Sequence, residues 1–468
     1  MIAETVQLLS GWNAADTWIV VTAALAAMAC ALPGNYLVLR RQSLMGDALS
    51  HSVLLGIVLA VLAANWIKMW LGLGDAGYVA LVAAAAFAGA VIVGVSTAVL
   101  TEWVRNLGRV EASAALGVVF TTLFALGIVL IRAAAEGVHI DLQCVLLGEI
   151  VSVTLDTWNW NGWAIPRAAV ANGAMLAVNG LLVLLFFKEL RLAAFDPGLA
   201  TTQGINARVV NHALMAVTAV TIVAAFRSVG SILVIAMLIV PPAAAYLLTN
   251  RLGRMIGLSL AIAAASAVLG HVSAIVVPAL LLPRLGLPAV GSASTAGMMA
   301  AASGALFVLA LLFGPRHGAL SRGIDRLRVS LRIAADDFLG WLYRVEENAA
   351  ADAAAIAAVG TATSGTLTGM HPWVTRLATW RLRSRRLIES AGGKYRLTER
   401  GRDAARELVR AHRLWEAFMQ KHIAVPDDHL HATAHRVEHF LDSDLRRELE
   451  AELDRPRHDP HGRDIPPE

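Results

Sequence analysis

Long apolar runs separated by short polar links fill the first two-thirds of the chain, and the last third lacks them. A helix that crosses the ~30 Å hydrocarbon core of a bilayer needs about 20 apolar residues. Nine runs reach or approach this length, the sixth being short: 17–39, 50–70, 77–102, 113–132, 168–187, 211–226, 229–249, 256–281 and 294–314. The pattern predicts an all-α polytopic membrane domain of about nine transmembrane helices over residues 1–318.

The remaining residues predict an α+β domain in three segments. Residues 319–370 begin as a polar, helix-prone link and end in a stretch of Ala, Gly and Thr with little to bury. Residues 371–410 hold a helix pattern and then two short strands around a Gly-Gly turn, which is a winged-helix outline. Residues 411–468 predict a histidine-rich pair of helices.

The distribution of charged residues predicts how the chain is oriented in a membrane. Only 16% of the 468 residues are charged, against about 25% in soluble proteins. The net charge of +4 need not indicate nucleic acid, because Arg and Lys gather in every second link, as in cytoplasmic loops. This bias predicts a multi-pass protein of the cell (inner) membrane, in contact with lipid, whose C-terminal domain is cytoplasmic. Cys30 and Cys144 lie among apolar residues and are read as core residues.

Two further features indicate a transporter subunit without its own motor. Gly230, Pro241 and Pro242 interrupt the seventh run, and broken helices at membrane depth are tolerated where they line a cavity or are buried in protein. None of the four lysines stands in the Gly-Lys-Ser/Thr sequence of a P-loop. We therefore expect no enzyme activity in this chain, and any ATP hydrolysis to come from a separate subunit.

Ionisable residues occur where apolar ones are expected. Asp47 and His51 open the second run four residues apart, so on a helix they share a face that could bind a divalent ion transiently or merely cap the helix at the interface. His139 and Asp141 form a second pair, with a solvated loop as the alternative. His271 is a lone membrane histidine, for which a hydrogen-bonded core residue is the alternative.

The segment Leu39–Ser52 resembles a signature of the manganese/zinc/iron ABC permease family. So do Phe195-Asp-Pro-Gly-Leu-Ala200 with Gly204, the stretch 229–243, and Pro315-Arg-His-Gly318, and the resemblance spans about residues 15–320. It implies that Asp47 and His51, with His139, Asp141 and His271, line the ion pathway. It also implies an ATPase-coupling loop, formed by Phe195, Asp196, Pro197, Ala200 and Gly204. The implied partners are an ABC ATPase subunit, an extracytoplasmic metal-binding protein, and a second permease copy or paralogue.

The C-terminal part offers two kinds of chemistry. Basic residues around the predicted helix and hairpin could contact DNA phosphates, or form a solvated basic face near the inner leaflet. They are Arg376, Arg381, Arg383, Arg385, Arg386 and Lys394. In the final segment, His435 and His439 share a helix face beside Glu438, a combination that suits a first-row divalent ion unless it is chance enrichment on a solvated helix. His412 and Glu416 likewise share a face.

This part resembles the iron- and manganese-dependent repressors over about residues 334–468. The resemblance is carried by Leu397–Gly401, His412–Glu416, the histidine run 431–439 and Pro460–Gly462 with Ile465-Pro466. It implies two neighbouring metal sites with the ligands His412, Glu416, His431, His435, Glu438 and His439. Asp337 falls at an N-terminal ligand position of the manganese-type branch, and Gly340 stands where that branch has a second acid. It also makes residues 319–370 the degenerate start of a helix-turn-helix, and 411–468 a metal-binding and dimerisation-like domain.

The leading hypothesis is the permease subunit of an ABC importer for a divalent transition metal, with Mn²⁺ the first choice and Zn²⁺ or Fe²⁺ as alternatives. The metal is its substrate and the effector of a fused sensing domain that regulates transport, and the permease needs no cofactor. The alternative is a membrane-tethered, metal-dependent transcription regulator that binds DNA. A self-powered secondary transporter is a third reading.

Overall fold

The computed structural model divides the chain into two compact units. They are Met1–Ser321, here called the membrane unit, and Arg322–Glu468, here called the C-terminal unit. The structure describes residues 10–71, 75–134, 150–160, 163–281, 283, 286, 293–315, 318–351, 372–391, 394–423, 433–435 and 437–467. The divisions predicted at 318, 370 and 410 remain predictions.

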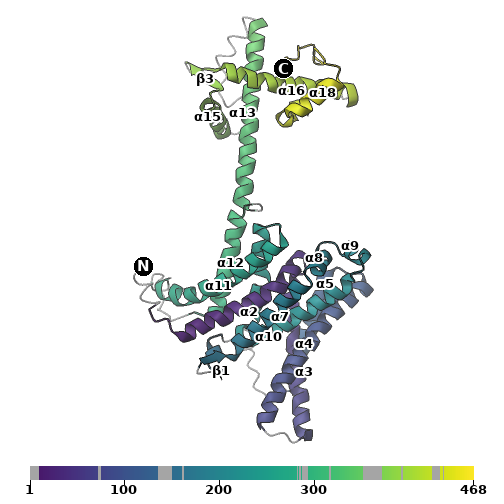
Figure 1. The fold of residues 1–468 in the computed structure, drawn as a ribbon, viewed down its shortest axis with the longest axis vertical. Coiled ribbons are helices and arrows are strands. Elements are labelled where there is room, and N and C mark those ends of the chain that lie inside the picture. Colours follow the sequence, from purple (N-terminus) through teal and green to yellow (C-terminus); the bar gives the residue numbers. More distant parts are fainter. Residues whose placement is uncertain are drawn as a thin grey trace. The chain divides into compact units, whose positions relative to one another are not determined.

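The membrane unit is built from helices, most of them long and apolar (Figure 1). They are α2 (Ala14–Leu39), α3 (Leu44–Leu71), α4 (Asp75–Gly108), α5 (Ala112–Ala134), α7 (Arg167–Leu185), α8 (Phe187–Phe195), α9 (Pro197–Thr202), α10 (Ala207–Leu248), α11 (Leu252–Leu281) and α12 (Thr295–Phe313). Among the described residues, 9 stretches are long and apolar enough to cross a membrane. The predicted polytopic helical fold is therefore confirmed.

Two predicted runs, 211–226 and 229–249, join in α10. The helix is broken at Gly230, whose φ of 75° and ψ of 164° are not helical. A positive φ of this kind is readily adopted only by glycine. Pro241 and Pro242, which we expected to interrupt the same run, lie inside the helix beyond this break.

Small residues let the membrane helices approach closely. Helix α2 packs against α7, α10 and α11, and α3 packs against α4 and α5. At the contact of α3 with α4, a Cβ atom on Gly56 would lie 2.2 Å from the carbonyl oxygen of Gly89. The two backbones touch there, as small residues allow in membrane helix pairs. Any side chain at Gly56 would force α3 away from α4.

Buried hydrogen bonds join helices that are distant in sequence. The amide nitrogen Nδ2 of Asn35 on α2 donates to the hydroxyl of Ser259 on α11 at 2.8 Å. The Nδ2 atom of Asn179 on α7 donates to the hydroxyl of Thr221 on α10 at 2.9 Å. In an apolar surrounding such bonds satisfy polar groups that would otherwise be costly to bury, so they fix the partners of each helix.

A short hairpin that the apolar pattern did not predict precedes α7. It follows the 3-10 helix η1 (Ile150–Thr154) and consists of β1 (Thr157–Trp160) and β2 (Trp163–Pro166), which pair antiparallel. Two of its tryptophans, Trp158 and Trp163, are exposed, as is common for aromatic residues at a membrane interface. Four-residue strands are too short to stand out from a link by periodicity alone.

The C-terminal unit has a winged-helix outline followed by a helical part (Figure 1). Its elements are α13 (Ala319–Ala351, which begins three residues before the unit), α15 (Pro372–Ser384), β3 (Ile388–Ala391), β4 (Lys394–Leu397), α16 (Glu399–Ile423), η3 (Glu438–Phe440) and α18 (Ser443–Glu452). The predicted hairpin is confirmed, with Ile388 opposite Leu397. The hydroxyl of Thr398 accepts a hydrogen bond from the amide of Gly401 at 3.0 Å, as expected for the cap of α16.

Candidate metal centre

The first pair of candidate ligands lies in the first two turns of α3. Asp47 Oδ1 and His51 Nε2 are 3.3 Å apart, and their side chains are 41% and 30% exposed. The His51 ring lies beside the rings of Phe120 and Phe124 on α5, with centroids 6.4 and 5.4 Å away. An imidazole and a carboxylate therefore share one face, with aromatic walls on one side and an accessible side left open.

His271 has different partners. It is buried on α11, where its Nε2 atom lies 3.3 Å from Asp16 Oδ1 on α2 and its Nδ1 atom lies 3.2 Å from the Thr295 hydroxyl on α12. Trp12 meets its ring edge-on. These contacts tie three helices together, which fits the hydrogen-bonded core histidine weighed above. Asp16 is a partner that sequence alone did not suggest, because 255 residues separate it from His271.

A denser cluster lies in the C-terminal unit. Helix α13 supplies Asp337, and the segment around η3 supplies His435, Glu438 and His439. One ligand atom from each of these four residues lies within 4.8 Å of all the others. Glu438, His439 and Asp337 have side chains only 1%, 3% and 8% exposed, whereas that of His435 is 45% exposed. We call these four residues the tail cluster.

The contacts within the tail cluster converge on Asp337 and Glu438. His435 Nδ1 is 2.9 Å from Glu438 Oε1, and its Nε2 atom is 3.5 Å from Asp337 Oδ1. His439 Nε2 is 3.1 Å from the same Asp337 oxygen. The spacing of three and four residues thus brings His435, Glu438 and His439 together around η3, and α13 adds an acid from nearly 100 positions earlier in the sequence.

Unsatisfied atoms indicate what the tail cluster could hold. Asp337 Oδ1 and both ring nitrogens of His439 are buried without a hydrogen-bond partner, although they lie within ion-pair distance of one another. Buried polar groups are normally hydrogen-bonded, so such atoms need an explanation. Two imidazoles and two carboxylates with lone pairs directed into one small space fit a first-row divalent ion. When bound, the ion would satisfy these atoms, with Asp337, His435, Glu438 and His439 as its holders.

The charges around the tail cluster shift two pKa values. Burial lowers the pKa of His439, but Asp336, Asp337 and Glu438 outweigh it and raise this pKa to about 9. Burial raises the pKa of Glu438, but His412, His435 and Arg344 outweigh it and lower this pKa to about 2. Glu438 is therefore ionised at any ordinary pH. His439 is protonated at neutral pH and carries a positive charge beside the acids.

His412 connects the tail cluster to a second candidate site on α16. Its Nδ1 atom lies 2.5 Å from Glu438 Oε2 and its Nε2 atom 3.0 Å from Glu416 Oε1, and all three residues are buried. Burial lowers the pKa of His412, but hydrogen bonds to the two glutamates raise it above its ordinary value. Glu438 thus contacts both groups of predicted ligands. His431, predicted to join them, lies outside the described residues, as do His139 and Asp141.

Two buried arginines of α16 hold the chain's last residues beside this site. Arg413, next to His412, binds Glu347 of α13 at 2.6 Å and the carbonyl oxygen of Asp464 at 2.5 Å. Arg410 donates to the carbonyl oxygen of Pro466 at 3.1 Å and pairs with Glu450 at 2.6 Å. Sequence reasoning missed both arginines, because their role depends on carbonyl groups more than 50 residues away.

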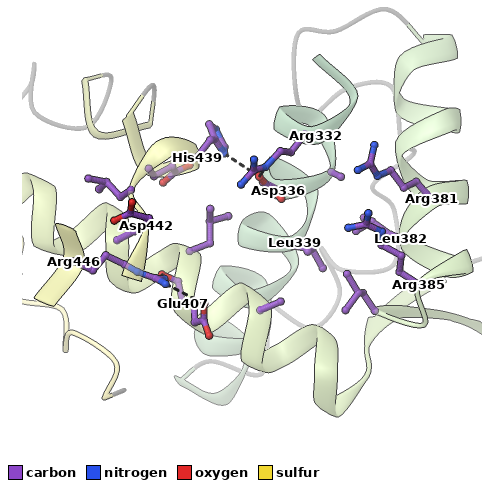
Figure 2. Close-up of a pocket in the computed structure, with 17 residues that line it drawn as sticks. Arg332, Asp336, Leu339, Arg381, Leu382, Arg385, Glu407, His439, Asp442 and Arg446 are labelled. Carbon is purple, nitrogen blue, oxygen red and sulfur yellow. Dashed lines mark hydrogen bonds and ion pairs between the residues drawn. The ribbon is translucent and has the colours of Figure 1, made fainter. Parts of the chain in front are cut away.

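Asp336 was also missed. Its Oδ2 atom lies 3.6 Å from His439 Nδ1 (Figure 2), whereas Asp337 contacts the other ring nitrogen of His439. Gly340, where the manganese-type branch has a second acid, carries no ligand, and a Cβ atom there would lie 3.2 Å from the Leu408 side chain. The only available signal was the adjacency of Asp336 and Asp337 in the sequence.

The basic residues are divided between two surroundings. Arg381 and Arg385 line a cavity of ≈ 550 Å³, together with Arg332, Asp336 and His439 (Figure 2). Arg376 and Arg383 are exposed on α15, and Arg386 follows it with a φ of 57°. Lys394 lies on β4, and its side chain is outside the described part of the structure. The predicted basic set therefore does not form one continuous face.

The predicted coupling loop forms a short helix between α8 and α10. Asp196 caps α9, its Oδ1 atom accepting from the amide of Leu199 at 2.9 Å, and Pro197 occupies the first turn. Ala200 is buried, and Gly204 turns the chain with a φ of 82°. Phe195 and Leu199 are large apolar side chains that stay exposed.

Comparisons with known proteins agree with this architecture. Residues 17–314 match the ABC 3 transport family, and residues 398–467 match the iron dependent repressor, metal binding and dimerisation domain. The zinc transport system membrane protein TroD of Treponema pallidum (strain Nichols) is 40% identical over 304 residues, which are 65% of this chain and 75% of that protein. The manganese transport system membrane protein MntD of Bacillus subtilis (strain 168) is 38% identical over 315 residues, 67% of this chain and 97% of that protein.

A solved structure is also similar. It is PsaBC from Streptococcus pneumoniae in complex with Fab, with a TM-score of 0.50 and 27% identity over 68% of this chain and 98% of the matched chain. One conclusion follows from the described apolar helices, from the family match over most of their length and from these relatives. The chain belongs to the ABC 3 transport family, as a multi-pass membrane protein with a repressor-type metal-binding and dimerisation domain near its C-terminus.

Proposed function

We propose that the chain is the permease subunit of an ABC importer for a divalent transition metal, with Mn²⁺ as the first choice and Zn²⁺ or Fe²⁺ as alternatives. The similar relatives include one named for zinc and one named for manganese. The pair Asp47–His51 supports this proposal, because a carboxylate and an imidazole on one half-exposed helix face suit all three ions. Two ligands hold an ion weakly enough to pass it on.

The proposed partners follow from the surfaces of the membrane unit. A separate ATPase subunit would dock on α9, where exposed Phe195 and Leu199 stand on a short helix that Asp196 caps. An extracytoplasmic metal-binding protein would deliver the ion. A second permease copy or paralogue would complete the pathway, because Asp47 and His51 fill only part of a metal's coordination sphere.

The C-terminal unit is proposed to sense metal in the cytoplasm and to regulate transport. One observation carries this proposal: the tail cluster brings four ligand residues together, with buried and unsatisfied ligand atoms, on the same chain as the permease. Its acids and imidazoles come from two elements that lie far apart in sequence, so an ion that binds there would join α13 to the segment around η3.

Uptake of radiolabelled Mn²⁺ into vesicles tests the regulatory role. The complete transporter is reconstituted with ATP and with increasing Mn²⁺ on the cytoplasmic side. We expect the wild-type rate to change as cytoplasmic Mn²⁺ rises, and the His435→Ala/His439→Ala variant to keep one rate throughout. His422→Ala is the matched control, because His422 lies on α16 with a different partner, Glu452. If the double variant responds like the wild type, the tail cluster has no regulatory role.

A second candidate is a membrane-tethered transcription regulator. It is supported by the order of α15 and the β3–β4 hairpin, which is that of a winged helix. The full chain in detergent is mixed with DNA from its own operon, with and without Mn²⁺. A metal-dependent shift that weakens steeply with salt would support DNA binding. The lack of such a shift would leave regulation of transport as the role of the domain.

A further inference from the structure

Helix α15 presents an apolar stripe to the outside of the C-terminal unit. Trp373, Leu377 and Trp380 are 48%, 44% and 70% exposed. Positions i, i+4 and i+7 fall within about 60° of one another on a helix of 3.6 residues per turn. The opposite side of α15 carries the residues that pack into the unit, among them Val374 and Ala378. The three side chains therefore form one continuous face that is partly exposed to solvent.

Basic residues border this stripe. Arg376 and Arg383 are exposed next to it on α15, and neither has an ion pair among the described residues. The helix thus combines aromatic and aliphatic side chains with guanidinium groups along one surface. Arg381 and Arg385 face the cavity of Figure 2 instead and take no part in this surface.

The stripe is poorly suited to DNA. The edges of base pairs in the major groove offer donors and acceptors, and the thymine methyl is the main apolar group there. A recognition helix at this place in a winged helix would lay two tryptophans and a leucine against mostly polar groups. The polar base edges would lose their water without gaining hydrogen bonds, which costs free energy.

A bilayer interface suits the same residues. Tryptophan is enriched at the level of lipid headgroups, because its ring is amphipathic. Amphipathic helices with Trp and Leu on one face and Arg beside them lie in the interface plane, and anionic lipids attract the arginines. The membrane helices of this chain keep the C-terminal unit tethered to a bilayer, which raises its effective concentration at the lipid surface.

We propose that α15 docks on an anionic lipid surface, with Trp373, Leu377 and Trp380 in the headgroup region and Arg376 and Arg383 against lipid phosphates. The proposal deepens the proposed function, since the cytoplasmic location of the unit determines that the inner leaflet is the surface contacted. Docking would hold the winged-helix part at the membrane and away from DNA.

Lipid-borne quenchers measure this contact directly. Ser384 is exposed at the end of the same face and can carry a fluorescent label as Ser384→Cys, in a background of Cys30→Ala and Cys144→Ala. The full chain is placed in nanodiscs that contain phosphatidylglycerol and a lipid with a quencher near its headgroup. We expect quenching several-fold stronger than for the same label at Asp444→Cys on α18, which is also exposed.

Variants of the stripe separate docking from simple proximity. Trp373→Ser/Trp380→Ser is expected to reduce quenching to the Asp444→Cys level, whereas Leu445→Ser, which removes an exposed leucine of α18, is expected to leave it unchanged. Arg376→Gln/Arg383→Gln should weaken docking, at about fivefold for each arginine near an anionic surface. Circular dichroism and the elution volume of each variant verify that the unit stays folded.

Three results would overturn the proposal. The first is equal quenching in the tryptophan double variant and the parent. The second is equal quenching in discs of phosphatidylcholine alone. The third is a label that responds to double-stranded DNA or to the ATPase subunit and ignores the lipid. No metal is added in this assay, so a failure of docking is distinct from a failure of metal uptake or of metal sensing. Both leaflets of a nanodisc have the same composition, so docking is measured whichever leaflet the C-terminal unit faces.

Discussion

The two candidate metal sites use the same kinds of ligand in opposite ways. In the membrane unit, Asp47 and His51 come from one helix, are partly exposed and contact mainly each other. In the C-terminal unit, the tail cluster draws ligands from two elements, buries Glu438 and His439, and leaves ligand atoms without hydrogen bonds. Residue type therefore does not separate the two sites, whereas the number of ligands and their burial do.

These differences in ligand number and burial would let one chain pass an ion on at the first site and retain it at the second. A site with two accessible ligands from the protein holds an ion briefly, because water or a partner must supply the rest of the coordination. A buried site with four converging ligands holds it longer, because each ligand is already in place. We infer that the first arrangement suits transport and the second suits measurement of a concentration.

The largest expected effect is on the membrane pair. Asp47→Ala or His51→Ala removes half of the ligands that the described chain supplies there. We therefore expect uptake of radiolabelled Mn²⁺ to fall by at least about 100-fold, which is more than the usual loss when a residue that only hydrogen-bonds to a metal ligand is changed. Metal binding by the C-terminal unit should not change. Thr121→Ala, an exposed hydroxyl on α5, is the control. Near-normal uptake in both ligand variants would remove the contrast between the two sites.

The next effect concerns Glu438, which contacts both His412 and His435. Glu438→Gln removes a buried charge from between two imidazoles, so we expect metal affinity of the full chain to fall by roughly 10- to 100-fold in calorimetric titration. The uptake rate at low cytoplasmic metal should stay the same. Glu452→Gln is the matched control, since Glu452 is an exposed partner of His422. A loss of uptake at low metal in Glu438→Gln would show that the sites are not separate.

The pH dependence of binding follows from His439, whose pKa is raised to about 9. A metal ligand must be neutral imidazole, so binding releases this proton, and affinity should rise by up to about tenfold per pH unit between roughly pH 6.5 and 9. The metal-free unit behaves in the opposite way. Its stabilisation by charged His439 is complete below about pH 6.5 and is lost as the pH rises through 9. Titrations at several pH values, with thermal unfolding beside them, measure both trends.

Asp336→Asn tests whether the neighbouring carboxylate of Asp336 raises the pKa of His439. The variant removes one of the carboxylates that raise the pKa of His439, so this pKa should fall and the affinity should reach its plateau at a lower pH. Asp325→Asn is the control, because Asp325 is an exposed acid on the same helix. An unchanged pH profile in Asp336→Asn would mean that Asp336 does not act on His439.

The smallest effect on metal handling is expected at Gly56. Gly56→Ala places a Cβ atom 2.2 Å from the Gly89 carbonyl oxygen, so α3 must move from α4, at a cost of about 1–3 kcal/mol in stability. Asp47 and His51 lie on the same helix, and uptake should fall by only a few-fold. Gly257→Ala on α11 meets nothing within 4 Å and is the control. Thermal unfolding in detergent compares the two variants.

Much of the fold could be predicted because lipid allows few solutions. Apolar length alone located the ends of each described membrane helix to within about six residues, and most closely for helices such as α2 (run 17–39), while the Gly-Gly turn located the β3–β4 hairpin. The break in the seventh run was predicted correctly at Gly230. Pro241 and Pro242 were also predicted to interrupt this run, but both lie inside the helix. Local chemistry did not decide there, because neighbouring membrane helices can satisfy the backbone groups that a proline frees.

The candidate sites were less predictable where a partner comes from afar. Spacing suggested that Asp47 lies near His51 and that His435 lies near His439, since each pair is four residues apart. It could not suggest that Asp16 meets His271, or that Asp336 approaches His439, because tertiary packing makes these contacts. Exposure was equally hidden from sequence, because an apolar residue such as Trp380 can still face outward, where it is 70% exposed.

The arginine-held tail has a consequence for the lifetime of the protein. Arg457 and His458 are exposed just before the residues whose carbonyl groups bind Arg413 and Arg410. A protease that cuts after Arg457 would release those carbonyls and leave two buried guanidinium groups short of partners, next to His412. The membrane helices would stay intact, so limited proteolysis would remove the proposed regulation of transport without lowering the abundance of the protein in the membrane.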